Sequence, residues 1–204
     1  MIRQIAVGFL LLSLLTSCVP KGSETQIQGE VKADSLKSVQ GRVVNRAYEV
    51  LNVMKDKDME KLADYVHPKK GVLFSPYGTI DKKRAQVLMP PLIKDLLAHS
   101  RQLEWGVDPA GGEPIRLNSQ SYFNHYVYDA EYGETDFVTF DGLHNETNQI
   151  QNIEDTFQQA HFVEFFVSGT EEFEGMDWKS LILVFSEYGG EPYLVGIIHD
   201  QKIP

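Results

Sequence analysis

Apolar positions after residue 40 follow the spacing of an amphipathic helix. They fall at i, i+4, i+7, i+8 and i+11, on Val43, Ala47, Val50, Leu51 and Met54. One face of a helix here would therefore be buried. Asp58 is a candidate N-cap for a further turn over residues 59–66, which Pro68 would end. Two more helices are expected, one over residues 82–99, broken or bent at its Pro-Pro pair, and a short aromatic one over residues 119–128.

The hydrophobic period changes toward the C-terminus and predicts strands. Residues 137–140 and 161–167 are β-branched and aromatic, and apolar runs over residues 181–185 and 193–198 flank a Gly-Gly turn typical of a hairpin. Residues 105–114 contain three glycines and two prolines and are expected to be a loop. Helices followed by antiparallel strands predict an α+β domain, with N-terminal helices packed on an antiparallel sheet. Because the last runs are apolar on both faces, the sheet should be covered on both sides or curled.

The N-terminal end has another pattern. Arg3 precedes an apolar run over residues 5–15, and a Thr-Ser pair leads to Cys18, the single cysteine of the chain. A positive start, a short apolar run and small residues before a cleavage point are typical of an export signal, too short to span a membrane. The Leu-Thr-Ser-Cys end resembles the lipobox of bacterial lipoproteins. This resemblance implies a lipid on Cys18, cleavage before it, and anchoring to a membrane of the cell envelope.

Composition divides the rest of the chain into two parts. Residues 19–40 are rich in Lys, Gly, Ser, Glu, Thr and Gln, so we predict a signal peptide over 1–17, a flexible tether over 18–40 and one globular domain over 41–204. About 22 tether residues would reach on the order of 25 Å. The net charge of −10 disfavours nucleic acid as a partner. A single cysteine leaves none for a disulfide, a thiolate nucleophile or a thiolate metal site.

Several motifs together resemble a family of uncharacterised bacterial lipoproteins. They are Tyr65 to Val72 (YVHPKKGV), Phe74 to Tyr77 (FSPY), Gly112 to Ile115 (GEPI), Phe123 to Asp129, Gly175 to Trp178 (GMDW) and Leu194 to Asp200. The order of elements also resembles the nuclear-transport-factor-2-like superfamily. That resemblance implies a strongly curved antiparallel sheet wrapped around a long helix to form a cone. The superfamily contains enzymes and non-enzymes, so the fold does not determine the function.

Glu164 is the strongest candidate for chemistry. It lies between Phe162 and Phe166 on one face of an expected strand. A carboxylate on an apolar face would be desolvated, its pKa would rise, and it could act as a general base. The resemblance implies that such a residue lines the cone. The alternative, which we favour, is a carboxylate that points to solvent at a sheet edge or pairs with a Lys, Arg or Tyr side chain.

Aromatic residues and one histidine are candidates for ligand binding. Trp105, Tyr122 and Tyr126 could form the wall of a pocket, although core packing explains such residues equally well. His199 ends the last expected strand and points to the opposite face from Asp200, so these two neighbours cannot form a catalytic pair with each other. A structural role for His199 is favoured over a catalytic one.

No motif in the sequence indicates a metal or a cofactor. His144 lies near Asp141 and Glu146, but such loose spacing is common by chance, and no zinc-protease, EF-hand, phosphate-loop or dinucleotide motif is present. We therefore expect neither group. The sequence predicts a lipid-anchored envelope protein that binds a small ligand or an envelope component without catalysis. The alternative is a small pocket enzyme, a hydrolase or isomerase, with Glu164 as its base.

Overall fold

The predicted amphipathic stripe lies on helix α1 (Glu24–Lys55) of the computed structural model, which describes residues 24–135, 137–144 and 152–202. Val43, Ala47, Val50, Leu51 and Met54 are all buried. Helix α2 (Met59–Tyr65) follows, and the Asp58 carboxylate caps it by accepting from the backbone N–H of Lys61 at 3.0 Å. Both helices confirm the sequence pattern, because burial and capping act at the expected positions.

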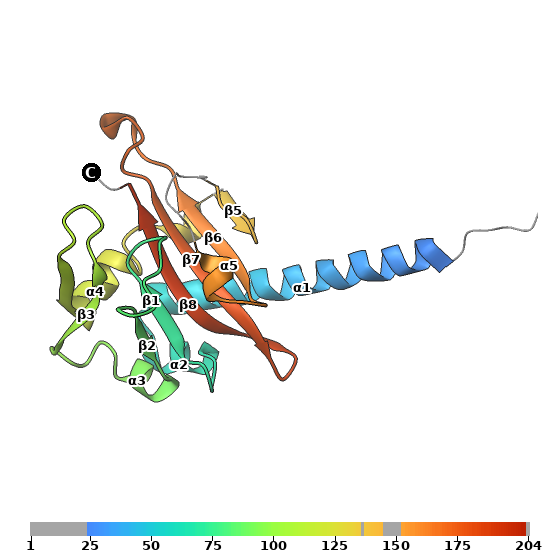
Figure 1. The fold of residues 1–204 in the computed structure, drawn as a ribbon, viewed down its shortest axis with the longest axis horizontal. Helices are drawn as coiled ribbons and strands as arrows, with labels where there is room; N and C mark the ends of the chain where they lie inside the picture. The colour runs from blue at the N-terminus through green and yellow to red at the C-terminus, as the bar shows by residue number, and fades with distance from the viewer. Residues whose placement is uncertain (1–23, 136, 145–151, 203–204) are drawn as a thin grey trace, which may run out of the picture. The chain divides into compact units, whose positions relative to one another are not determined.

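A six-stranded sheet forms the centre of the fold (Figure 1). Its strands, in the order β2-β1-β8-β7-β6-β5, are β2 (Gln86–Leu88), β1 (Val72–Ser75), β8 (Glu191–Gln201), β7 (Lys179–Tyr188), β6 (His161–Val167) and β5 (Phe137–Phe140). The α+β class is confirmed. The sheet is mixed rather than antiparallel throughout, because β1 runs parallel to β8. The strong curvature expected from the resemblance is not confirmed.

Two expectations about the middle of the chain are wrong. The helix expected over residues 82–99 is replaced by strand β2 and the short helix α3 (Pro90–Lys94). Proline lacks an N–H donor, so it suits the first turn of a helix and not its interior, and α3 begins at the Pro-Pro pair. The ends of the loop expected over residues 105–114 instead lie in a two-stranded antiparallel sheet of β3 (Gln102–Val107) and β4 (Pro114–Asn118). The residues between the two strands, 108–113, form the turn.

Short helical segments connect the remaining strands. Helix α4 (Ser119–Tyr126) confirms the predicted aromatic helix and is capped by Asn118, whose side chain accepts from Ser121 N at 2.8 Å. The 3-10 turns η1 (Tyr132–Glu134) and η2 (Glu171–Phe173) and helix α5 (Ile153–Thr156) complete the elements of the described residues.

Two hydrophobic clusters lie on the two faces of the sheet. The larger contains the buried residues of α1, α2, β3 and α4 with the inward side chains of β6 and β7, such as Val163 and Leu183. The smaller lies on the opposite face and includes Ile153 of α5 with Ile182 and Ile198. Figure 1 shows α5 in front of the sheet and α1 behind it. Burial on both faces explains the continuous apolar runs of β7 and β8.

A β-bulge interrupts the β7–β8 ladder. Val184 pairs with Gly196 and Phe185 pairs with Leu194, so Val195 is an extra residue in β8. Gly196 then lies under the ring of Phe157, since a Cβ atom at this position would be 2.7 Å from Phe157 Cζ. The bulge and the glycine together let Phe157 approach the backbone of the sheet.

The chain divides into two units, Met1–Lys37 and Ser38–Pro204. In the first unit, residues from Glu24 onward are helical, and they overlap the segment for which a flexible tether is predicted. Cys18 and the predicted signal peptide lie outside the described residues. Within the described part of the chain, no helix combines the length and the apolar character that a membrane span requires.

Candidate functional site

The four residues predicted as binding candidates lie in one chain of ring contacts. Trp105 of β3 stacks on Tyr122 of α4 with ring centroids 3.9 Å apart and an interplanar angle of 10°. Tyr122 lies 5.3 Å from Tyr126, and Tyr126 meets the ring of His199 edge-on at 5.6 Å. Helix α4 and the β3–β4 hairpin thus bring these rings to the end of β8. We call Phe74, Trp105, Tyr122 and Tyr126 the aromatic cluster.

Most of the aromatic cluster is core. Phe74 packs against both Trp105 and Tyr122, and these three side chains are at most 1% exposed. Trp105 Nε1 donates to the Leu117 carbonyl at 3.0 Å. The Tyr122 hydroxyl is buried and has no hydrogen-bond partner among the described residues. Burial, followed by the effect of Tyr126, raises the pKa of Tyr122 well above its usual value.

His199 joins the aromatic cluster to an acidic residue. Its Nδ1 lies 3.1 Å from the Pro76 carbonyl, which can only accept, so Nδ1 carries a hydrogen. Its Nε2 lies 3.3 Å from Asp129 Oδ2, an ion-pair distance. The His199 side chain is completely buried. The structure therefore gives His199 one hydrogen-bonded partner, the Pro76 carbonyl, and places its Nε2 near Asp129 without a hydrogen bond.

Asp129 is the centre of this polar network. Its carboxylate accepts from the Tyr132 hydroxyl at 2.6 Å and from Lys179 Nζ at 2.5 Å, in addition to facing His199. Burial alone would raise the pKa of Asp129, but the nearby His199 ring, followed by the hydrogen bonds from Lys179 and Tyr132, holds it well below its usual range. The ionised carboxylate is thus well satisfied, as a buried charge must be.

Glu164 lies on the face of the sheet opposite α1, and it is 3% exposed. Its Oε1 accepts from Ser180 Oγ at 2.6 Å, and its Oε2 accepts from His144 N at 2.5 Å. Thr139 Oγ1 lies 3.2 Å from Oε2 but is closer to the Gly142 carbonyl, at 2.6 Å. Both oxygens are therefore bonded within the fold. The partners are hydroxyl and backbone N–H groups and not the Lys, Arg or Tyr side chain that the sequence alternative named, and a role as a general base stays a prediction.

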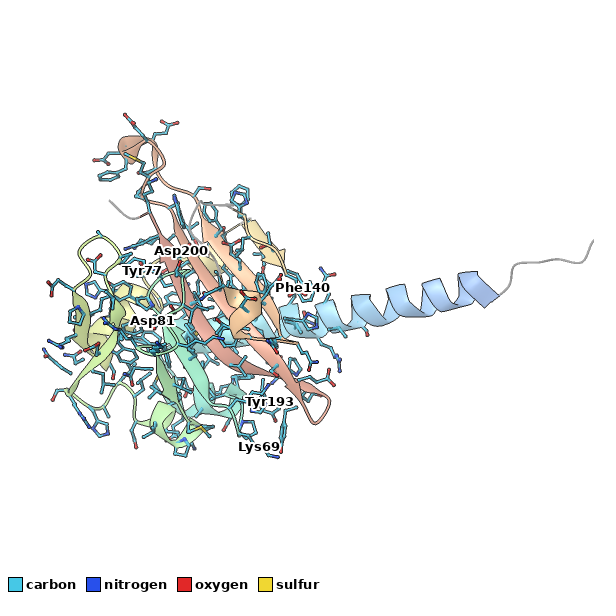
Figure 2. All side chains as sticks on the ribbon, in the orientation of Figure 1. Lys69, Tyr77, Asp81, Phe140, Tyr193 and Asp200 are labelled. Carbon is cyan, nitrogen blue, oxygen red and sulfur yellow. The ribbon has the colours of Figure 1, made fainter. Side chains whose placement is uncertain are left out.

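A second buried carboxylate lies on the same face. Asp200 accepts from Gly78 N at 3.3 Å and from Gln201 N at 3.1 Å, and Figure 2 shows it close to Tyr77. Burial raises the pKa of Asp200, and the charge of Glu164 adds to this effect. Gly78 has no room for a side chain, since a Cβ atom would lie 2.7 Å from Asp200 Oδ2.

No group of three or more potential ligands that could hold a metal ion occurs among the residues that the structure describes.

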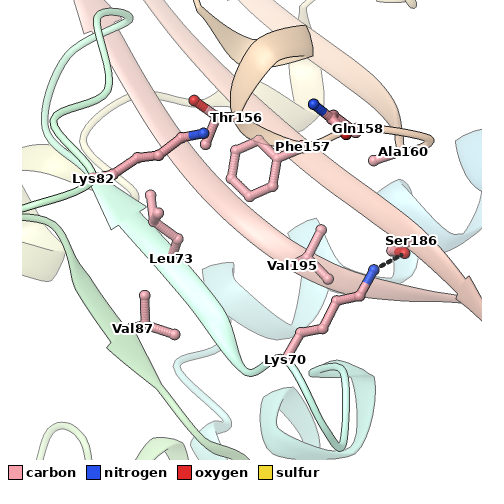
Figure 3. Close-up of a pocket in the computed structure, with 10 residues that line it drawn as sticks. All are labelled: Lys70, Leu73, Lys82, Val87, Thr156, Phe157, Gln158, Ala160, Ser186 and Val195. Carbon is pink, nitrogen blue, oxygen red and sulfur yellow. Dashed lines mark hydrogen bonds between the residues drawn. The ribbon is translucent and has the colours of Figure 1, made fainter.

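A pocket opens on this outer face between strands β1 and β8 and the segment around α5 (Figure 3). Its volume is about 390 Å³. We call it the lysine pocket; Lys70, Lys82, Thr156, Gln158 and Ser186 are its polar lining residues, and Leu73, Val87, Phe157, Ala160 and Val195 are its apolar ones. An apolar wall with a few converging polar groups is typical of a small-molecule site. None of the residues predicted as site candidates lines it.

The His-Pro-Lys-Lys-Gly motif builds one end of the lysine pocket. His67 Nδ1 accepts from the backbone N–H groups of Lys69 and Lys70, both at 3.1 Å, and Gly71 N donates to the His67 carbonyl at 2.9 Å. Gly71 has a φ of 70°, and a Cβ atom there would lie 2.7 Å from the Leu88 carbonyl oxygen. The turn directs Lys70 to Ser186 Oγ, at 2.7 Å.

Burial lowers the pKa of His67, and the charges of Lys70 and Lys69 add to this effect. A neutral ring is also what the turn requires, because Nδ1 accepts two hydrogen bonds. Sequence reasoning singled out this motif only as a family resemblance. The turn geometry shows that the motif positions a lysine.

Another hollow, of about 570 Å³, lies beside α3 and β3. Its apolar walls include Leu88, Leu92, Leu96 and Leu103, and His99 and Arg101 lie at its edge. Its polar lining residues are Gln86, Ser119 and three consecutive residues of the loop over 99–101. The lysine pocket instead brings two ammonium groups, those of Lys70 and Lys82, to one apolar wall, which is why we favour it as the candidate site.

No family model and no curated protein matches the chain. Among solved structures, a variant of a protein named Rd1NTF2_05 is 11% identical, covers 82% of this chain and 98% of its own, and has a TM-score of 0.29. A structure assigned as a calcium/calmodulin dependent protein kinase II association domain from Xanthomonas campestris is 9% identical, covers 91% of this chain and 92% of its own, and has a TM-score of 0.28. At these TM-scores the likenesses say nothing about function, which must follow from the site itself.

Proposed function

We propose that this chain is a lipid-anchored protein of the bacterial cell envelope that binds a small ligand without catalysis. The observation that carries the binding role is the lysine pocket, in which polar groups from four segments surround an apolar floor. The anchoring role rests on the N-terminal pattern that ends in Cys18. Each buried CH₂ group of a lipid contributes about 0.8 kcal/mol, so two or more acyl chains would hold the protein stably at a membrane.

Occupancy of the lysine pocket is tested with the neutral fluorescent probe N-phenyl-1-naphthylamine. We expect saturable binding to the wild type and a clear loss of binding in Ala160→Phe, because a ring at this lining position fills the pocket. Ala98→Phe adds the same ring at an exposed position outside the pocket and should bind as the wild type does. Equal binding by both variants would show that the probe uses another site.

The anchor is tested separately by fractionation of cells that express the full chain. The wild type should enter the detergent-extracted membrane fraction, and Cys18→Ala should move to the soluble fraction. Mass spectrometry of the N-terminus should find the lipid on Cys18 of the wild type. A Cys18→Ala protein that stays with the membrane would contradict the anchoring role.

A further inference from the structure

We infer that the lysine pocket takes an organic anion with an apolar body, of the class of a medium-chain carboxylate, with its negative group against Lys70 and Ser186. The inference rests on the proposed binding function and specifies the ligand class for the same pocket. Four features of the pocket support it: unbalanced positive charge, free donor capacity, an apolar floor and a small volume.

The charge of the pocket is not balanced by acidic side chains. Neither Lys70 nor Lys82 forms an ion pair with a carboxylate of the described residues, whereas Arg46, Lys94 and Lys179 each do. The chain as a whole carries a net charge of −10. Two cations facing one cavity without acidic partners are therefore a local positive site on an acidic protein, which favours an anionic ligand.

Both lysines are placed by the fold and keep donors for a ligand. Lys70 Nζ bonds Ser186 Oγ at 2.7 Å, and Lys82 Nζ bonds the Asp155 carbonyl at 3.0 Å. An ammonium group has three N–H donors, so each lysine can still donate to an anion. The Thr156 hydroxyl, which also lines the pocket, is buried and has no hydrogen-bond partner among the described residues. A buried hydroxyl without a partner gains from a ligand that supplies one.

The floor between the polar ends is apolar. Figure 3 shows Lys82 and Thr156 at one side of the pocket, Lys70 and Ser186 at another, and Leu73, Val195 and Phe157 between them. A simple inorganic anion would leave this floor in contact with water. An apolar body would cover it, at about 25 cal/mol for each Å² removed from water. The volume of about 390 Å³ is at the low end for ligand pockets, which favours a small molecule over a long lipid.

The test compares octanoate, 1-octanol and acetate as competitors of N-phenyl-1-naphthylamine on the wild-type protein. Octanoate should displace the probe at concentrations about three- to tenfold lower than 1-octanol, because the carboxylate adds an ion pair with a partly exposed lysine. Acetate, which has the charge without the body, should not displace it. Equal displacement by octanoate and 1-octanol would overturn the inference and leave the binding function intact.

Two matched lysine variants test whether Lys70 is the cation that binds the carboxylate of octanoate. Lys70→Met should weaken octanoate about three- to tenfold and leave 1-octanol unchanged. Lys69→Met is the control, because it removes the same charge from the adjacent residue, which lies over the ring of Tyr188, 5.2 Å from its centroid. If Lys69→Met weakens octanoate as much as Lys70→Met, the effect is one of general surface charge and the inference is wrong. If N-phenyl-1-naphthylamine does not bind the wild-type protein at all, the proposed binding function itself is wrong.

Discussion

At the scale of single residues, two buried tyrosines have opposite environments. The Tyr122 hydroxyl has no partner among the described residues, while the Tyr132 hydroxyl donates to Asp129 at 2.6 Å. An unsatisfied buried hydroxyl costs about 1–3 kcal/mol, and a hydrogen bond to a charged group contributes about 1.5–3 kcal/mol. The same chemical change at the two positions should therefore have effects of opposite sign.

Tyr122→Phe should leave the free energy of unfolding unchanged or raise it by about 1 kcal/mol, because it removes the unsatisfied hydroxyl. Tyr132→Phe, the matched control, should lower it by about 2 kcal/mol, because it removes a charge-assisted bond. Urea unfolding at neutral pH measures both values. A loss of stability in Tyr122→Phe would mean that its hydroxyl has a partner, such as water, that the protein depends on.

Two glycines with similar backbone angles differ in their surroundings. Gly71 and Gly112 have φ of 70° and 72°, but a Cβ atom would lie 2.7 Å from the Leu88 carbonyl oxygen at Gly71 and would meet nothing within 4 Å at Gly112. Gly112→Ala should lower the free energy of unfolding by about 1 kcal/mol, from the backbone angle alone. Gly71→Ala should cost at least about twice as much. Similar losses in urea unfolding would show that the contact at Gly71 relaxes without cost.

At the scale of elements, the turn over residues 67–71 links protonation to the position of a lysine. The His67 ring must be neutral to accept from the N–H groups of Lys69 and Lys70. Its folded pKa lies below the ordinary value of 6.5. The folded state therefore favours the neutral ring. The stabilising contribution of the turn is complete above pH 6.5 and is lost as the pH falls through the folded pKa.

His67→Asn should remove this pH dependence, because an asparagine side chain accepts from N–H groups two residues on without titrating in this range. Between pH 7 and pH 5 the wild type should lose more of its free energy of unfolding than His67→Asn does. The slope of the free energy of unfolding against pH is compared between the two proteins. The contributions of the other histidines cancel, because both proteins contain them. Parallel slopes would show that protonation of His67 does not open the turn.

The elements also show which parts of the fold the sequence predicts. Strands β6, β7 and β8 are long apolar runs, and their periodicity is visible locally. Strands β1 and β2 contain four and three residues, and β1 is held by the parallel strand β8 more than a hundred residues away. Periodicity cannot detect such short strands, because their stability comes from distant partners. The same holds for the lysine pocket, which the tertiary fold assembles from separate segments.

At the scale of the whole molecule, α1 belongs to the core of the second unit. Val43, Ala47, Val50, Leu51 and Met54 are each at most 4% exposed. Deleting one large buried side chain costs about 2–5 kcal/mol, and a typical domain is stable by only about 5–15 kcal/mol. The domain therefore cannot lose this helix, whereas the residues before Ser38 form a separate unit.

A protein of residues 38–204 should unfold in one cooperative transition, with a midpoint close to that of the non-lipidated Cys18→Ala chain. A protein of residues 57–204, which lacks α1, should show no cooperative transition. Circular dichroism during urea unfolding distinguishes the two results. A cooperative transition in the shorter protein would mean that the sheet and the remaining elements suffice for folding.

The close approach of Phe157 to Gly196 has a consequence for how the sequence can change over time. A side chain at position 196 and a ring at position 157 would occupy the same space, so position 196 cannot gain a side chain while position 157 keeps its ring. Related proteins that carry a larger residue at 196 should carry a smaller one at 157, and the two substitutions should arise together. Such exchanged pairs would reshape the floor of the lysine pocket, so related proteins could acquire different ligands through two coupled substitutions.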